Sequence, residues 1–127
     1  MTTDTWRICV ELLGWHVATD EDRIAMDPYR HNYRWHLIDG EPCLFVGGAI
    51  PDLTRLDGCR AFEDALLARG LLYLPDEGGC FEHTYIRKLM IVYRQVDSIA
   101  NYYTAALRAT PAQRVAACIA VLEEITK

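Results

Sequence analysis

Residues 110–125 carry the sequence feature that most constrains the fold of this chain. Thr110, Pro111 and Gln113 occupy the N-cap, first and third positions of a predicted helix, which is the pattern of a capping box. A helical stripe of apolar residues follows, made of Val115, Cys118, Ile119, Leu122 and Ile125. A helix with one apolar face has to bury that face, so the rest of the chain must supply a matching surface.

Two earlier segments predict further helices. In residues 4–13 the apolar side chains fall on one helical face, and Gly14 follows as a stop signal. In residues 57–70, Asp57 stands where it can cap a helix and Gly70 where it can end one. With the C-terminal helix, the sequence therefore predicts three amphipathic helices.

Residues 31–48 change to the two-residue period of a strand. Residues 31–38 alternate between two faces, and residues 39–42 (DGEP) have the composition of a tight turn. Residues 43–48 follow as a second strand. The segment therefore predicts a β-hairpin.

The two faces of the first hairpin strand are expected to have different surroundings. Tyr33, Trp35 and Leu37 fall on the face that we expect to pack against the helices. Arg34 and His36 fall on the other face, where they stay available to solvent or to a partner.

Further strands are predicted at residues 15–19, 71–74 and 81–97, the last because it is rich in β-forming residues. Residues 98–108 fit either a helix, because of their alanines, or a strand that pairs back. The sequence thus predicts one α+β domain over residues 1–127, with an antiparallel sheet of about four to five strands packed against three helices.

The predicted core gathers large apolar residues from all of these elements. Half of the 127 residues are hydrophobic, which is enough for a sizeable core. The residues expected in it are Trp6, Val10, Leu13, Trp15, Leu37, Phe45, Phe62, Leu66, Leu89, Ile91, Ile119 and Leu122.

Charge is distributed unevenly along the chain. The net charge of −5 disfavours general binding to nucleic acid or to an anionic membrane surface. Residues 21–41 mix basic and aromatic residues, but three arginines there face five acidic residues. Residues 84–114 instead carry five cations against one acidic residue, a net charge of +4. Nucleic-acid binding through this segment, centred on Arg87, Lys88 and Arg94, therefore stands as an alternative function.

No arrangement of residues in the sequence indicates catalysis or a metal site. The five cysteines lack the short paired spacings of a zinc site, and buried, reduced thiols are the ordinary interpretation. His31 and His36 fall on opposite faces of a strand, so they cannot share a metal ion. We therefore assign no catalytic residue, no metal site and no cofactor, and we expect the protein not to be an enzyme.

Three segments together resemble a known family. They are residues 11–17 (ELLGWHV), residues 50–66 (IPDLTRLDGCRAFEDAL) and residues 109–122 (ATPAQRVAACIAVL). In this order they resemble the small phage and prophage proteins that have a phage α/β/α sandwich domain. The resemblance implies a compact domain from a phage or an integrated element. It also favours a strand within residues 98–108, and it transfers no catalytic residue.

We expect a small, non-catalytic accessory protein of phage or prophage type that binds a host or phage protein, with inhibition of a host defence component as one such role. No apolar run is long enough to cross a membrane and the first residues lack signal-peptide character, so we expect it to act in the cytoplasm of a bacterial host. The residues expected to form its interaction surface are Arg30, Arg34, His36, Arg87, Lys88, Arg94, Asp76 and Glu77.

Overall fold

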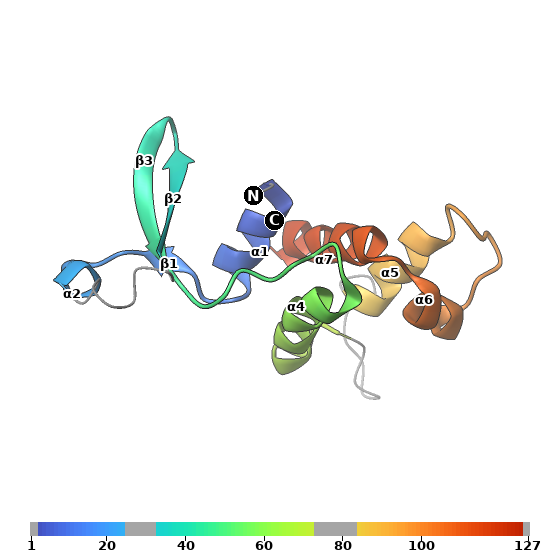
Figure 1. Ribbon diagram of the computed structural model, residues 1–127. Coiled ribbons are helices and arrows are strands. Elements are labelled where there is room, and N and C mark those ends of the chain that lie inside the picture. Colours follow the sequence, from blue (N-terminus) through green and yellow to red (C-terminus); the bar gives the residue numbers. More distant parts are fainter. Residues whose placement is uncertain (1–2, 25–32, 73–83, 126–127) are drawn as a thin grey trace.

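The computed structural model describes residues 3–24, 33–72 and 84–125, which form a small antiparallel sheet at one end of a group of helices (Figure 1). The six helices of this described part are α1 (Thr3–Glu11), α2 (Asp20–Ile24), α4 (Leu56–Ala68), α5 (Tyr85–Tyr93), α6 (Tyr102–Arg108) and α7 (Pro111–Ile125). Its three strands are β1 (His16–Val17), β2 (Tyr33–Ile38) and β3 (Glu41–Val46). The predicted α+β class is confirmed, with more helices and fewer strands than expected.

The sheet is built on the predicted hairpin, with strand order β1-β3-β2. Strands β2 and β3 are joined by a two-residue turn, and Ile38 pairs with Glu41 across it. Asp39 and Gly40 both have positive φ, 51° and 81°, which is the backbone that a two-residue hairpin turn requires and that glycine adopts without strain. Strand β1 pairs only with the base of β3, so the outer half of the hairpin projects beyond the rest of the sheet (Figure 1).

Helix α7 confirms the predicted capping box. The Thr110 N–H donates to Gln113 Oε1 at 2.8 Å, and the Gln113 N–H donates to Thr110 Oγ1 at 3.2 Å. Cys118 and Leu122 are fully buried in the stripe that the sequence predicted. Ile125, at the end of that stripe, is exposed.

Helix α4 confirms the second predicted helix, although its start differs. Cys59, Phe62 and Leu66 are fully buried on its inner face. The N-cap residue is Arg55, which makes no side-chain capping bond, and Asp57 lies in the first turn. The prediction that Asp57 caps this helix is therefore wrong.

The predicted strand at residues 81–97 is wrong, because its described part forms helix α5. Thr84 caps this helix by accepting a hydrogen bond from the Arg87 N–H, at 3.4 Å. Tyr85 and Leu89, four residues apart, are both buried. The apolar residues of this segment satisfy a helical spacing as well as an alternating one, and packing against α7 selects the helix.

Residues 98–108 fit either a helix or a strand in sequence, and the structure forms helix α6 there. The strand that the family resemblance favoured is therefore wrong. The Asn101 side chain accepts a hydrogen bond from the Thr104 N–H at 3.0 Å and caps the helix. The strand predicted at 15–19 is reduced to β1. Leu71 and Leu72 lie outside any strand, and residues 73–74 lie outside the described residues.

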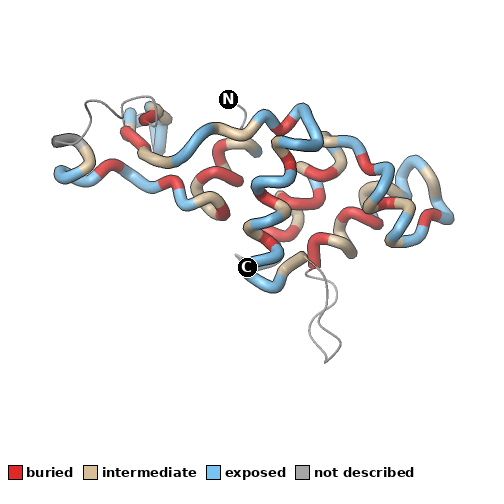
Figure 2. The backbone as a smooth tube through the Cα atoms, turned by 60° about the horizontal axis from the view of Figure 1, so that its bottom comes forward, coloured by how far each residue is buried: buried red, intermediate tan, exposed pale blue. Residues whose placement is uncertain are grey.

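Helix α1 connects the helices to the sheet. Its residues Ile8 and Leu12 pack in the larger core, which the helices share, whereas Trp6 and Cys9 pack in a smaller cluster at the sheet. Buried residues accordingly occur both at the sheet and among the helices (Figure 2). The sheet is therefore attached to the helices mainly through one helix.

Most of the predicted core is confirmed. Those found buried are Trp6, Trp15, Phe45, Phe62, Leu66, Leu89 and Leu122, and those partly buried against a cluster are Val10, Leu13 and Ile119. Leu37 and Ile91 are exposed, so these two predictions are wrong. No helix in the described part of the chain has the length and apolar character to cross a membrane.

Candidate interaction surface

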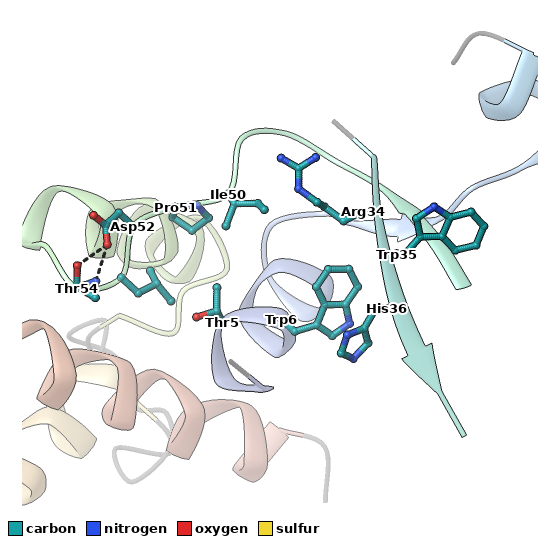
Figure 3. A pocket seen from close by; sticks show the side chains of 10 residues that line it. Thr5, Trp6, Arg34, Trp35, His36, Ile50, Pro51, Asp52 and Thr54 are labelled. Carbon is teal, nitrogen blue, oxygen red and sulfur yellow. Dashed lines mark hydrogen bonds between the residues drawn. The ribbon is translucent and has the colours of Figure 1, made fainter. Parts of the chain in front are cut away.

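The two faces of β2 are reversed relative to the prediction. Trp35 and Leu37, expected in the core, are 66% and 63% exposed. His36 instead stacks on Trp6 of α1, with ring centroids 4.4 Å apart and an interplanar angle of 26°. Figure 3 shows Trp35 on the far side of the strand, pointing away from this stack.

Phe45 on β3 explains the reversal. It pairs with Arg34, so the two side chains share a face of the sheet. The rings of Phe45 and Trp6 pack edge-on, with their centroids 4.7 Å apart. Because Phe45 faces α1, the face of β2 that carries Arg34 and His36 also faces α1. A two-residue turn at residues 39–40 fixes this register. The sequence alone could therefore have shown that Phe45 and Leu37 cannot face the same core.

The face toward α1 borders an open groove of about 660 Å³. The Arg34 side chain, on the β2 wall of the groove, points toward Ile50, which lies on the opposite wall (Figure 3). That wall, residues 50–54, lies close against the start of α4, because Gly58 has no Cβ that would overlap the Asp52 backbone. The groove thus depends on contacts between three separate segments of the chain.

The charged groups of the groove already have partners within the protein. Arg34 Nη1 donates to the Tyr33 carbonyl at 2.7 Å. The Asp52 carboxylate accepts hydrogen bonds from the Thr54 hydroxyl and N–H, which lower the pKa of Asp52 and keep it ionised. Within the described ranges, no three His, Cys, Asp or Glu side chains are grouped so that they could hold a metal ion.

The opposite face of the hairpin has no charged residue on either strand. It consists of Tyr33, Trp35 and Leu37 from β2 and of Pro42, Leu44 and Val46 from β3. Its base is covered, because Tyr33 and Leu44 pack with Ala18 and the Tyr33 hydroxyl donates to the Asp22 carbonyl at 2.6 Å. Its outer half is exposed. We call this outer half, Trp35, Leu37 and Pro42, the open hairpin face.

Exposed acidic side chains lie at the tip of the hairpin and on α2. Asp39 and Glu41 are exposed at the tip, and Asp20 and Glu21 are exposed on α2. Glu41 pairs with Ile38, so it belongs to the face toward α1 and not to the open hairpin face. The hairpin therefore combines one uncharged apolar face with acidic residues at its tip.

The predicted cations of residues 84–114 lie elsewhere. Lys88 Nζ is 3.4 Å from Glu124 Oε1, and Arg94 Nε donates to the Ala100 carbonyl at 2.8 Å. With Arg87, which is partly buried, they belong to α5 and its C-cap, away from the hairpin (Figure 1). The structure thus brings Arg34 and His36 together but separates them from these three. The remaining predicted residues, Arg30, Asp76 and Glu77, lie outside the described residues.

Sequence reasoning missed a buried polar cluster among the helices. Arg114 Nη1 donates to Glu63 Oε2 at 2.9 Å, and the Tyr85 hydroxyl donates to the same oxygen at 2.7 Å. Burial, and then the Glu63 charge, raise the pKa of Tyr85 above its usual range. Residues 63, 85 and 114 are too far apart in the sequence for any spacing rule to connect them. The cluster joins α4, α5 and α7.

Burial also suppresses the chemistry of the helical thiols. It raises the pKa of Cys59 to about 11 and that of Cys118 further still, so both thiols stay protonated near neutral pH. Their place in the larger core is that of small apolar residues.

Compared with known proteins, the chain matches no family model, no curated protein and no solved structure. The resemblance to phage α/β/α sandwich proteins therefore stays a prediction. The class that the structure itself defines is a small α+β protein with a projecting, apolar-faced hairpin.

Proposed function

We propose that this protein is a non-catalytic interaction protein that binds a partner protein through the open hairpin face. The observation that carries this proposal is the exposure of Trp35 and Leu37 side by side on an uncharged strand face. Large apolar side chains presented together on a rigid element are typical of protein-binding surfaces.

The size of these side chains supports a role in binding. Moving one Trp and one Leu side chain from water into an apolar site stabilises a complex by about 5 kcal/mol before entropic costs. Antiparallel pairing with β3 holds both residues in place, so little further ordering is required when a partner binds.

The charge of the chain favours a partner with an apolar cleft and basic residues beside it. Asp39 and Glu41 are exposed at the tip of the hairpin, and the whole chain carries a net charge of −5. The open hairpin face covers roughly 300 Å². A specific interface uses about 800 Å² on each partner, so a flat contact would be too small and the partner must also contact the sides of the hairpin.

The alternative of nucleic-acid binding through residues 84–114 has less support. The ammonium of Lys88 is paired with Glu124, Arg94 bonds a backbone carbonyl, and Arg114 is buried on Glu63. Phosphate binding requires several cations that are not already committed to other groups. A phage origin, action in a bacterial cytoplasm and a host defence component as target are parts of the proposal that rest on sequence reasoning alone.

A capture experiment with matched variants tests the proposal. The wild-type protein, Trp35→Ser/Leu37→Ser and the control Leu56→Ser/Leu67→Ser, which alters two exposed leucines of α4, are immobilised and exposed to an extract of the cells that carry the gene. We expect a protein that wild type and control retain, and that the hairpin variant retains at least tenfold less, which corresponds to about 1.4 kcal/mol. If no retained protein distinguishes the hairpin variant from the control, the proposal is wrong.

A further inference from the structure

A second group of exposed apolar side chains lies at the end of the molecule opposite the hairpin. Val96, Ile99, Tyr103 and Leu107 are 78%, 88%, 81% and 82% exposed. They belong to the loop after α5 and to α6, which lie together at this end (Figure 1). We call these four side chains the distal patch.

Helix α6 presents half of the distal patch on one face. Tyr103 and Leu107 are four residues apart, so they are neighbours on the helix surface. Ala105 and Ala109 lie on the opposite side and are buried in the larger core. Tyr102 also packs against that core. The inner side of α6 is therefore packed, whereas Tyr103 and Leu107 on its outer side are large, apolar and exposed.

Hydrogen bonds hold the preceding loop in place. Arg94 Nε donates to the Ala100 carbonyl at 2.8 Å, and the Ala100 N–H donates to the Asp97 carbonyl at 3.1 Å. Ala100 is buried, and its neighbour Ile99 is left exposed. The exposure of the loop residues is therefore a fixed property of the fold, and a partner would meet a preorganised surface.

The area of the distal patch reaches the lower bound for a symmetric pair. One exposed Tyr and three exposed aliphatic side chains together offer roughly 500 Å². Two copies would bury about 1,000 Å² between them, which is the lower bound for a specific interface.

The charges at this end suit self-association as well. Asp97 follows Val96 in the chain and the exposed Arg108 follows Leu107, so a two-fold arrangement can place the cation of one copy near the anion of the other.

We propose that two copies of this chain form a homodimer through the distal patch. The dimer does not rest on the function proposed above, because the hairpins lie at the far ends and stay free. It would present two open hairpin faces to partners.

Sedimentation velocity over a wide range of protein concentration tests this inference. We expect the wild type to reach twice the mass of one chain, and Leu107→Lys to dissociate at a concentration at least tenfold higher. The control Leu67→Lys places the same charge at an exposed leucine of α4 and is expected to dimerise like the wild type. Circular dichroism establishes that each variant is folded, and Tyr103→Ala serves as a second, uncharged disruption.

Three results would overturn the homodimer. The first is a wild type that stays monomeric at the highest concentration, and the second is a Leu107→Lys variant as dimeric as the wild type. The third is flotation of the wild type, but not of Leu107→Lys, with vesicles of phosphatidylcholine and phosphatidylglycerol, because the patch would then bind a lipid surface.

Discussion

At the scale of single residues, Arg114 connects several helices. From α7 it bonds Glu63 of α4 at 2.9 Å, the Ala106 carbonyl of α6 at 2.6 Å and the Ala109 carbonyl at 3.0 Å. Its guanidinium therefore satisfies backbone acceptors at the end of α6 and a carboxylate on α4 at the same time.

We predict that Arg114→Gln lowers the free energy of unfolding by about 3 kcal/mol, because it leaves the Glu63 carboxylate partly buried without its cation. Urea denaturation measures the loss. The control Arg108→Gln changes an exposed arginine of α6 and should shift the free energy by less than about 0.5 kcal/mol. Equal losses of unfolding free energy in the two variants would contradict a stabilising role for the pair of Arg114 and Glu63.

Trp35 differs from the other two tryptophans of the chain. Trp6 and Trp15 are buried, whereas Trp35 lies mostly in solvent. We predict that acrylamide quenches a readily accessible fraction of the tryptophan fluorescence and that Trp35→Phe removes this fraction. If an accessible fraction of the fluorescence survives in Trp35→Phe, the exposed tryptophan is not Trp35, and the face of β2 that carries Trp35 is not the exposed one.

At the scale of elements, α5 has the strongest conflict between local preference and packing. Its sequence, YIRKLMIVY, is rich in strand-forming residues. In a helix, Leu89 and Ile91 lie on nearly opposite sides, and the structure buries the first and exposes the second. A strand would have placed both on one face.

This difference gives a direct test of α5. We predict that Leu89→Ala costs about 3 kcal/mol of unfolding free energy, because it leaves a cavity in the larger core. Ile91→Ala should cost less than about 1 kcal/mol, because its side chain is largely in water. Chemical denaturation measures the unfolding free energy of both variants. Similar losses at positions 89 and 91 would favour a strand over a helix for residues 85–93.

The elements that the sequence predicts correctly are those with local signals. The capping box of α7 and the turn of the hairpin are made by residues close together in the chain. The predicted turn covers residues 39–42 with a strand from 43, whereas only residues 39 and 40 form it and β3 begins at Glu41. Helix α5 and the faces of β2 depend instead on contacts with distant residues, namely the surface of α7 and the ring of Trp6. Propensity cannot decide such cases, since packing overrides it.

At the scale of the whole molecule, the position of α1 separates two surfaces of different kind. One side of α1 packs in the helical core and the other carries the sheet, so the hairpin projects at one end and the distal patch lies at the other (Figure 1). Sequence patterns predicted most of the elements, but not this arrangement. For that reason those predicted interaction residues that the structure describes are divided between the groove beside Trp6 and helix α5 with its C-cap.

Site-specific crosslinking tests the central claim, that the open hairpin face binds a partner protein. Trp35 is replaced by the photoreactive residue p-benzoylphenylalanine, with the same replacement of the exposed Leu67 on α4 as the control. We predict that irradiation in an extract of the cells that carry the gene yields a crosslinked protein from position 35 and not from position 67. The absence of an adduct at position 35, or the same adduct from both positions, would contradict the account.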